Sequence, residues 1–278
     1  MPVFWKTIFK TFLFIFAFIG LGFTVVFLGM RMGIFNVRGS IQERNEFFEN
    51  TETTVATCMD DSRSCDWMKT PEWTAIKGGL EKDAEIILRV SRETGVSPRM
   101  IVAAVVPEQT RFFTSNREIF KSYFEPMKVL GSLTKFSLGI SGIKQETANE
   151  IEKYAQDPNS VFYPGREMAE LFAYAEGENR SNVLYARLTD AKDHYYQYLY
   201  TALYIKEIEA HWANEGYDIS QNSGVVVTLF NLGFRASKPK SNPIVAGAPI
   251  TTGGKVYTYG ALGAAFYDSN ELRGIFPR

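Results

Sequence analysis

A single carboxylate follows an apolar run in the middle of this 278-residue chain. Residues 100–106 are all apolar, and Pro107 and Glu108 come directly after them. An apolar surround disfavours the charged form of a carboxyl group, which suits it to deliver a proton near neutral pH. Pro107 cannot donate a helical hydrogen bond to Ala103, so we expect the helix to kink or end here, with Glu108 near its C-terminus. Glu108 is therefore a candidate general acid/base, with Arg111 as a candidate charge neighbour. The competing interpretation is a solvated glutamate at a helix end.

Two further short segments combine glycines with polar side chains. In the first, Gly139 and Gly142 indicate a tight turn that leads into a helix. In the second, Asn231 is expected at a helix C-terminus that Gly233 caps. The segments read Ser137-Leu138-Gly139-Ile140-Ser141-Gly142-Ile143, with Gln145 and Thr147-Ala148 close behind, and Leu229-Phe230-Asn231-Leu232-Gly233.

In this order and rough spacing the three segments resemble the signature of the lysozyme-like lytic transglycosylases, the class of the soluble lytic transglycosylases and goose-type lysozyme-like domains. These enzymes cut the glycan strands of peptidoglycan. The resemblance covers roughly residues 81–233. It implies that Glu108 is the catalytic residue, and it implies a substrate-binding role for Gln109, Ser137, Gly139, Gly142, Ile143, Gln145, Phe230 and Asn231.

The resemblance also implies a mechanism with one carboxylate. Glu108 would protonate the leaving oxygen of the MurNAc–GlcNAc bond and then accept a proton from the 6-hydroxyl group, which gives a 1,6-anhydro product. Most glycosidases instead use two carboxylates. Glu125, Glu146 and Asp193 are candidates for a second one, and no position singles any of them out.

Three positions depart from the family pattern. Gln109 stands where the family has Ser, Gly142 where it has Gln, and Phe230 where it has Tyr. The last two changes remove polar groups expected beside the acid, although Gln109 or Gln145 could supply an amide from nearby. Two functions therefore stay open: a peptidoglycan lytic transglycosylase or muramidase, and a catalytically inactive lysozyme-like protein that binds glycan or scaffolds an envelope complex.

The N-terminus has the composition of a membrane segment. Residues 11–30 contain no charge and are rich in Phe, Leu, Ile and Val, with Lys6 and Lys10 before them and Arg31 and Arg38 after them. Twenty apolar residues in a helix span the hydrocarbon core of a bilayer, about 30 Å. We expect residues 1–31 to form a short cytoplasmic tail and an uncleaved transmembrane anchor, which places the rest of the chain outside the cytoplasm. A cleaved signal peptide is the alternative, and the residues before Arg31 form a poor cleavage site.

Residues 32–72 are polar and show little apolar periodicity, so we expect a stalk or linker. The chain's two cysteines, Cys58 and Cys65, lie in this stretch. Outside the cytoplasm a disulfide between them is favoured, and two free thiols are the alternative. No histidine lies near them, so we expect no metal site.

Residues 73–278 are expected to form one mainly α lysozyme-like α+β domain with a small β-hairpin. Apolar spacing predicts helices that start near residue 80 and near residue 98, with Gly95 ending the first of them. The net charge of −1 gives no basic surface for nucleic acid. The expected partners are glycan strands, the membrane and envelope proteins, and no cofactor is expected. Further helices are expected over residues 147–154, 166–176, 190–215, 221–231 and 260–272, and a hairpin over residues 249–259.

Overall fold

The computed structural model describes residues 10–14, 16–24, 65–114 and 139–278. Within these ranges the chain is mainly helical and has one small antiparallel sheet, as the composition and spacing predict. The chain divides into two compact units, Met1–Thr51 and Glu52–Arg278. Of the residues singled out by sequence, Cys58, Glu125 and Ser137 lie outside the described ranges.

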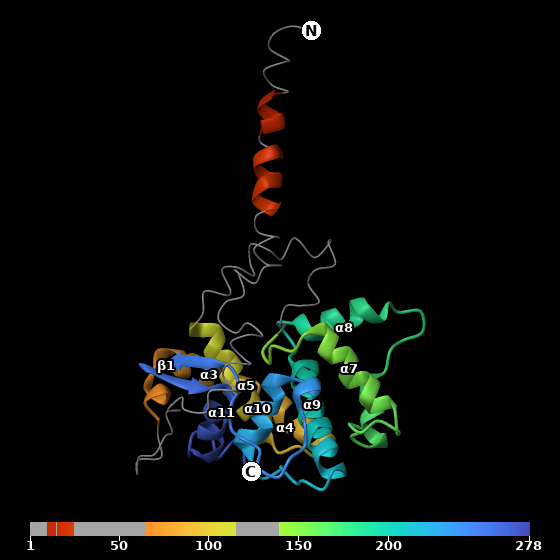
Figure 1. Cartoon of the computed structure of the whole chain (residues 1–278), viewed down its shortest axis with the longest axis vertical. Coiled ribbons are helices and arrows are strands. Elements are labelled where there is room, and N and C mark those ends of the chain that lie inside the picture. Colours follow the sequence, from red (N-terminus) through yellow and green to blue (C-terminus); the bar gives the residue numbers. More distant parts are fainter. Residues whose placement is uncertain (1–9, 15, 25–64, 115–138) are drawn as a thin grey trace. The chain divides into compact units, whose positions relative to one another are not determined.

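The second unit contains the described elements that follow residue 64, and Figure 1 labels most of the helices and one strand. In chain order they are η1 (Asp66–Lys69), α3 (Pro71–Lys82), α4 (Ala84–Thr94), α5 (Pro98–Thr114), α7 (Gln145–Gln156), η4 (Arg166–Phe172), α8 (Arg180–Thr189), α9 (Tyr195–Asn214), α10 (Ser223–Leu232), η5 (Phe234–Ala236), β1 (Pro249–Thr252), β2 (Lys255–Thr258) and α11 (Tyr259–Asp268).

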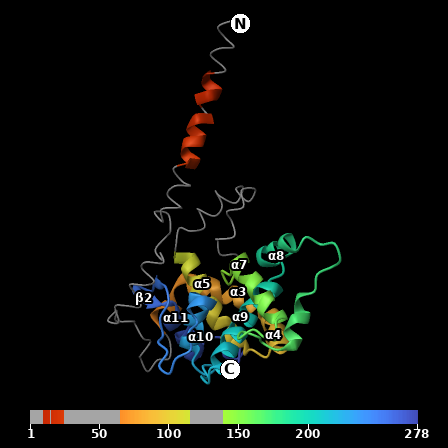
Figure 2. The same cartoon turned by 45° about the vertical axis from the view of Figure 1, so that its right-hand side comes forward.

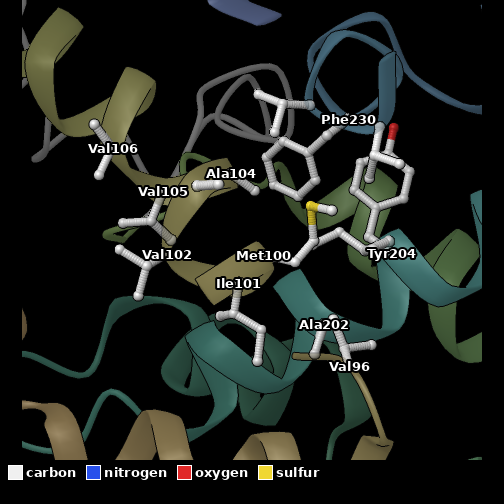
Figure 3. Packing of buried hydrophobic residues seen from close by; sticks show 14 of the residues in the cluster. Val96, Met100, Ile101, Val102, Ala104, Val105, Val106, Ala202, Tyr204 and Phe230 are labelled. Carbon is white, nitrogen blue, oxygen red and sulfur yellow. The ribbon is translucent and has the colours of Figure 1, made fainter. Parts of the chain in front are cut away.

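Helix α5 forms the centre of this unit. It packs against α3, α4, α9, α10, α11 and β1, and Figures 1 and 2 show it among these elements. Its residues 100–106 are almost completely buried, as the continuous apolar run predicts. Figure 3 shows Met100 of this helix between the rings of Phe230 and Tyr204. Helices α7 and α8 and the 3₁₀ helix η4 form a second layer that packs on α9 and on one another.

Local sequence signals set many of the helix ends. Thr70 caps α3 by accepting a hydrogen bond from the backbone N–H of Trp73, and Pro71 occupies the first turn. Gly95 ends α4 in the left-handed conformation, as predicted. The Ser97 hydroxyl accepts from the N–H of Met100 at 3.1 Å, which caps the start of α5.

The predicted hairpin is present. Strands β1 and β2 pair antiparallel with Ile250 opposite Tyr257. Both turn residues, Gly253 and Gly254, have positive φ, which is the backbone of the tight hairpin turn that suits the twist of the strands.

The prediction that the central helix kinks or ends at Pro107 is wrong in one respect, because α5 continues to Thr114. Tertiary packing on several sides holds the helix together past the missing hydrogen bond. The carbonyl of Ala103, which Pro107 cannot serve, faces Gly263 of α11, where an added Cβ would lie 2.7 Å from its oxygen. The carbonyl of Ala104 accepts a second bond, from the Tyr259 hydroxyl at 3.1 Å. Glu108 therefore lies within a helix and not at its C-terminal end.

Several other boundaries also differ from the expected ones. The long helix α9 begins at Tyr195, and residues 166–176 form only the short η4. Neither α3 nor α8 was predicted from the sequence. Trp67 and Met68, from the stretch expected to be a linker, are buried against this core.

The N-terminal unit is helical at residues 10–14 and 16–24, and its aromatic and aliphatic side chains are exposed. None of the helices in the described ranges combines the length and apolar character needed to cross a bilayer. The expected anchor at residues 11–30 extends past these ranges and stays a prediction.

Candidate functional site

Glu108 projects from the middle of α5 and is almost buried, with 8% of its surface exposed. The guanidinium of Arg111, one turn further along the helix, binds both carboxylate oxygens. Its Nη2 lies 2.7 Å from Oε1 and 2.5 Å from Oε2. The predicted charge neighbour is therefore confirmed. One guanidinium nitrogen therefore contacts both oxygens, and this charge-assisted contact neutralises the carboxylate.

The glycine turn of the second segment lies directly against Glu108. Gly139 and Gly142 both have positive φ, +62° and +64°, which a residue with a side chain adopts only with strain. A Cβ atom at Gly142 would overlap the Oε1, Cδ and Cγ atoms of Glu108. The Nε2 of Gln109 donates to the carbonyl of Ile140. The first two sequence segments thus meet at one carboxylate.

Gln197 of α9 also holds this turn in place, through hydrogen bonds of its side-chain amide. It is buried, its Oε1 accepts from the N–H of Ile140 at 2.7 Å, and its Nε2 donates to the Asp190 carbonyl at 2.6 Å. The hydroxyl of Ser141 also contacts the Gln197 carbonyl, at 3.4 Å. Sequence reasoning missed Gln197. The only signal was a polar residue within the aromatic-rich stretch of α9.

The third segment lies at the end of α10 next to α5. Gly233 caps α10, and the Phe230 ring packs on Tyr204 with ring centroids 5.0 Å apart (Figure 3). The Oδ1 of Asn231 accepts from the N–H of Ala248 at 2.9 Å. Asn231 therefore helps to fix the chain that leads into β1.

Two other residues predicted to bind substrate, Ile143 and Gln145, make contacts within the protein. Ile143 is buried in the core. Gln145, at the start of α7, donates to the carbonyl and hydroxyl oxygens of Ser181 in α8. Of the two amides proposed to replace the family's glutamine, only that of Gln109 reaches the turn beside Glu108.

Two tyrosines pack around these segments, and sequence reasoning did not single out Tyr259. The Tyr259 side chain is completely buried under α5. Burial raises the pKa of Tyr259 well above its usual value, and the negative charge of Glu108 adds to the effect. The Tyr204 ring packs at a tilt on the Phe230 ring, and its hydroxyl lies near Gly233. The Tyr259 hydroxyl donates to the Ala104 carbonyl of α5.

Charge around Glu108 is balanced by Arg111. Burial by itself would lower the pKa of Arg111, but the charge of Glu108 and the hydrogen bond to it outweigh burial and raise that pKa. Arg111 therefore stays a cation beside Glu108.

A second carboxylate does not join the site among the residues that the structure describes. Glu146 is exposed at the start of α7, and Asp193 is exposed and accepts from the N–H of Tyr195. The buried Glu152 is committed elsewhere. It binds the hydroxyls of Tyr174 and Tyr200 and pairs with the guanidinium groups of Arg180 and Arg187.

The described ranges contain no group of three or more His, Cys, Asp or Glu side chains placed to hold a metal ion. Cys65 is buried and disulfide-bonded, and its expected partner Cys58 lies outside these ranges. Comparisons with known protein families, with curated proteins and with solved structures gave no match.

Proposed function

We propose that this protein cleaves peptidoglycan as a membrane-anchored, extracytoplasmic lytic transglycosylase with Glu108 as its single acid/base. The observation that carries the proposal is the contact between Glu108 and Gly142. It joins two sequence segments that lie 30 residues apart, and that resemble neighbouring parts of one catalytic signature, at one nearly buried carboxylate.

The surroundings of Glu108 fit a mechanism with one carboxylate. In its protonated form Glu108 would give its proton to the glycosidic oxygen as the bond to C1 breaks. The resulting carboxylate, held by Arg111, would accept the proton of the substrate's own 6-hydroxyl as that oxygen bonds to C1. No second carboxylate and no cofactor is needed for this sequence of steps.

The alternative is a catalytically inactive lysozyme-like protein that binds glycan or scaffolds an envelope complex. Three observations favour it. Arg111 occupies both oxygens of Glu108, Phe230 lacks a hydroxyl, and Asn231 is bonded to the backbone of Ala248. The two functions predict opposite results when the protein is incubated with peptidoglycan: the enzyme releases soluble products, and the inactive protein releases none.

The deciding experiment incubates the full chain, in detergent, with peptidoglycan sacculi and identifies the soluble products by mass spectrometry. Anhydro-muropeptides are expected from the wild type. Glu108→Gln is expected to lower their rate of release by roughly 10²–10⁴-fold, since it removes the acid/base group. Glu146→Gln, which changes an exposed glutamate of α7, is the matched control and should leave the rate unchanged.

Other outcomes separate the remaining possibilities. Products with reducing ends would indicate a hydrolase and hence a second carboxylate. A folded wild type that releases nothing, yet sediments with sacculi, would rule out the enzyme and support the binding protein.

A further inference from the structure

The side chain of Glu108 rests on the backbone of Gly142. An ideal Cβ at position 142 would overlap the carboxylate carbon and Oε1 of Glu108, and it would come within 2.7 Å of Cγ. Contacts this short do not occur between real side chains, so Glu108 can hold this conformation only if residue 142 is glycine. The positive φ of +64° favours glycine at the same position.

Arg111 acts on the same carboxylate atom that faces Gly142. Its Nη2 binds Oε1 at 2.7 Å and Oε2 at 2.5 Å. Glu108 and Arg111 are three residues apart on α5, which places their side chains on one helix face. The Arg111 guanidinium, which belongs to the same helix, therefore restrains the carboxylate on one side. Gly142 of the turn contacts it on another side.

Two glutamines, Gln109 and Gln197, hold the turn that carries Gly142. Gln109 binds the Ile140 carbonyl, and the buried Gln197 accepts from the Ile140 N–H. A turn tied in this way to α5 and α9 gives the carboxylate a fixed surface to rest on. Restraint of this kind on a reacting group contributes to its reactivity, because its orientation is set before substrate binds.

We propose that Gly142 and Arg111 are positioning residues that together hold the carboxylate of Glu108 against the turn of residues 139–143. The catalytic meaning of this arrangement rests on the proposed function. Gly142 then has a role of its own in this chain: it makes room for Glu108 where the resembling enzymes carry a glutamine.

A double-mutant cycle tests the contact independently of activity. Gly142→Ala is made in the wild-type chain and in Glu108→Ala, and both pairs are unfolded in urea. We expect Gly142→Ala to raise the unfolding equilibrium constant at least tenfold more in the wild-type background, because only there does the new methyl group meet a carboxylate. Equal effects in the two backgrounds would overturn the proposal.

The matched control is Gly216→Ala, since Gly216 also has a positive φ, +85°, and has no atom within 4 Å of an added Cβ. It reports backbone strain alone and should have the same effect in both backgrounds. If Gly142→Ala prevents folding of the wild-type chain but not of Glu108→Ala, the proposal is supported in its strongest form. Failure to fold in both backgrounds would overturn it.

A second arm measures turnover of sacculi by the full chain. Gly142→Ala and Arg111→Gln are expected to lower kcat at least tenfold with the apparent KM within twofold, and Arg111→Lys should recover part of the loss. Unchanged kcat in Arg111→Gln would remove Arg111 from the proposal. If the wild type is inactive but the urea cycle shows coupling, the proposed function fails and the positioning of Glu108 by Gly142 stands.

Discussion

Glu207 is the most unusual single residue outside the candidate site. It lies in the middle of α9 with no exposed surface, and neither carboxylate oxygen has a hydrogen-bond partner among the residues described. Burial raises its pKa well above the usual value. A buried carboxyl without a partner avoids the cost of an isolated charge by staying protonated.

The raised pKa gives stability a definite pH dependence. Above the ordinary glutamate pKa of about 4.5 the unfolded chain releases the Glu207 proton while the folded chain keeps it. The folded state is therefore disfavoured by roughly 1.4 kcal/mol for each pH unit above that value, until the folded pKa is reached.

Glu207→Gln removes this titration and keeps the shape of the side chain. We expect little change in the free energy of unfolding near pH 4.5 and a gain of at least 1–2 kcal/mol, roughly, at pH 8. Urea unfolding at pH 4.5, 6.5 and 8 measures the difference. Glu85→Gln, which changes an exposed glutamate of α4, is the control and should change the free energy of unfolding little. A gain from Glu207→Gln that did not grow with pH would mean that Glu207 is ionised in the folded protein.

At the level of elements, the packing of α10 on α11 depends on small residues. A Cβ at Gly260 would overlap the Thr228 hydroxyl and lie 2.6 Å from the Gly224 carbonyl, and a Cβ at Gly263 would lie 2.7 Å from both Ala103 O and a methyl of Val227. These glycines let α11 approach both α10 and α5, and α11 carries Tyr259 to the carbonyl of Ala104 beneath the site.

Gly260→Ala should therefore destabilise the protein, by about 1–3 kcal/mol or more, as overpacked cores do. Gly79→Ala is the matched control. Gly79 lies within α3 with nothing within 4 Å of an added Cβ, so alanine there should stabilise by about 0.5–1 kcal/mol through helix propensity. Thermal or urea unfolding of the two variants measures both signs. A stabilising Gly260→Ala would show that α10 and α11 are further apart than the structure has them.

The sequence predicted the elements whose signals are local. The Gly253-Gly254 hairpin, the Gly95 stop and the buried helix of residues 100–106 all follow from turn chemistry or apolar spacing. It did not predict that α5 passes Pro107, because that depends on packing from segments more than 100 residues away. In the site, the contact of Glu108 with Arg111 was predictable from their i, i+3 spacing. The contact of Glu108 with Gly142 and the hydrogen bond from Ile140 to Gln197 join residues far apart in the sequence, so the sequence did not predict them.

At the scale of the whole molecule, one buried cation joins the C-terminus to the core. The guanidinium of Arg99, at the start of α5, donates to backbone carbonyls of α11 and of the turns after it. Desolvation lowers its pKa to about 10, so it remains charged at neutral pH. The acceptors are the carbonyl oxygens of Phe266, Tyr267, Ser269, Glu271 and Phe276. Helix α5 thus carries Glu108 near its middle. At its N-terminal end it carries Arg99, which ties the C-terminal residues to the core.

The N-terminal segment bears on where the molecule works. The proposed function requires the protein to lie beside a polymeric wall, and an uncharged stretch of 20 residues is long enough to hold it there by crossing the membrane. We expect the full chain expressed in bacteria to pellet with membranes, to resist alkaline carbonate extraction and to be released by detergent.

Two lysines placed in the segment should abolish this behaviour. Phe18 and Leu21 both have exposed side chains within the helix of residues 16–24. A lysine near the centre of a membrane-spanning helix costs about 2.5–3.5 kcal/mol, so the pair Phe18→Lys and Leu21→Lys should shift most of the protein into the carbonate-soluble fraction. Phe18→Leu with Leu21→Phe keeps the apolar character and should stay in the pellet. Extraction of the wild type by carbonate alone would instead indicate a chain that is not anchored, and its access to glycan would then have to come from binding at the site itself.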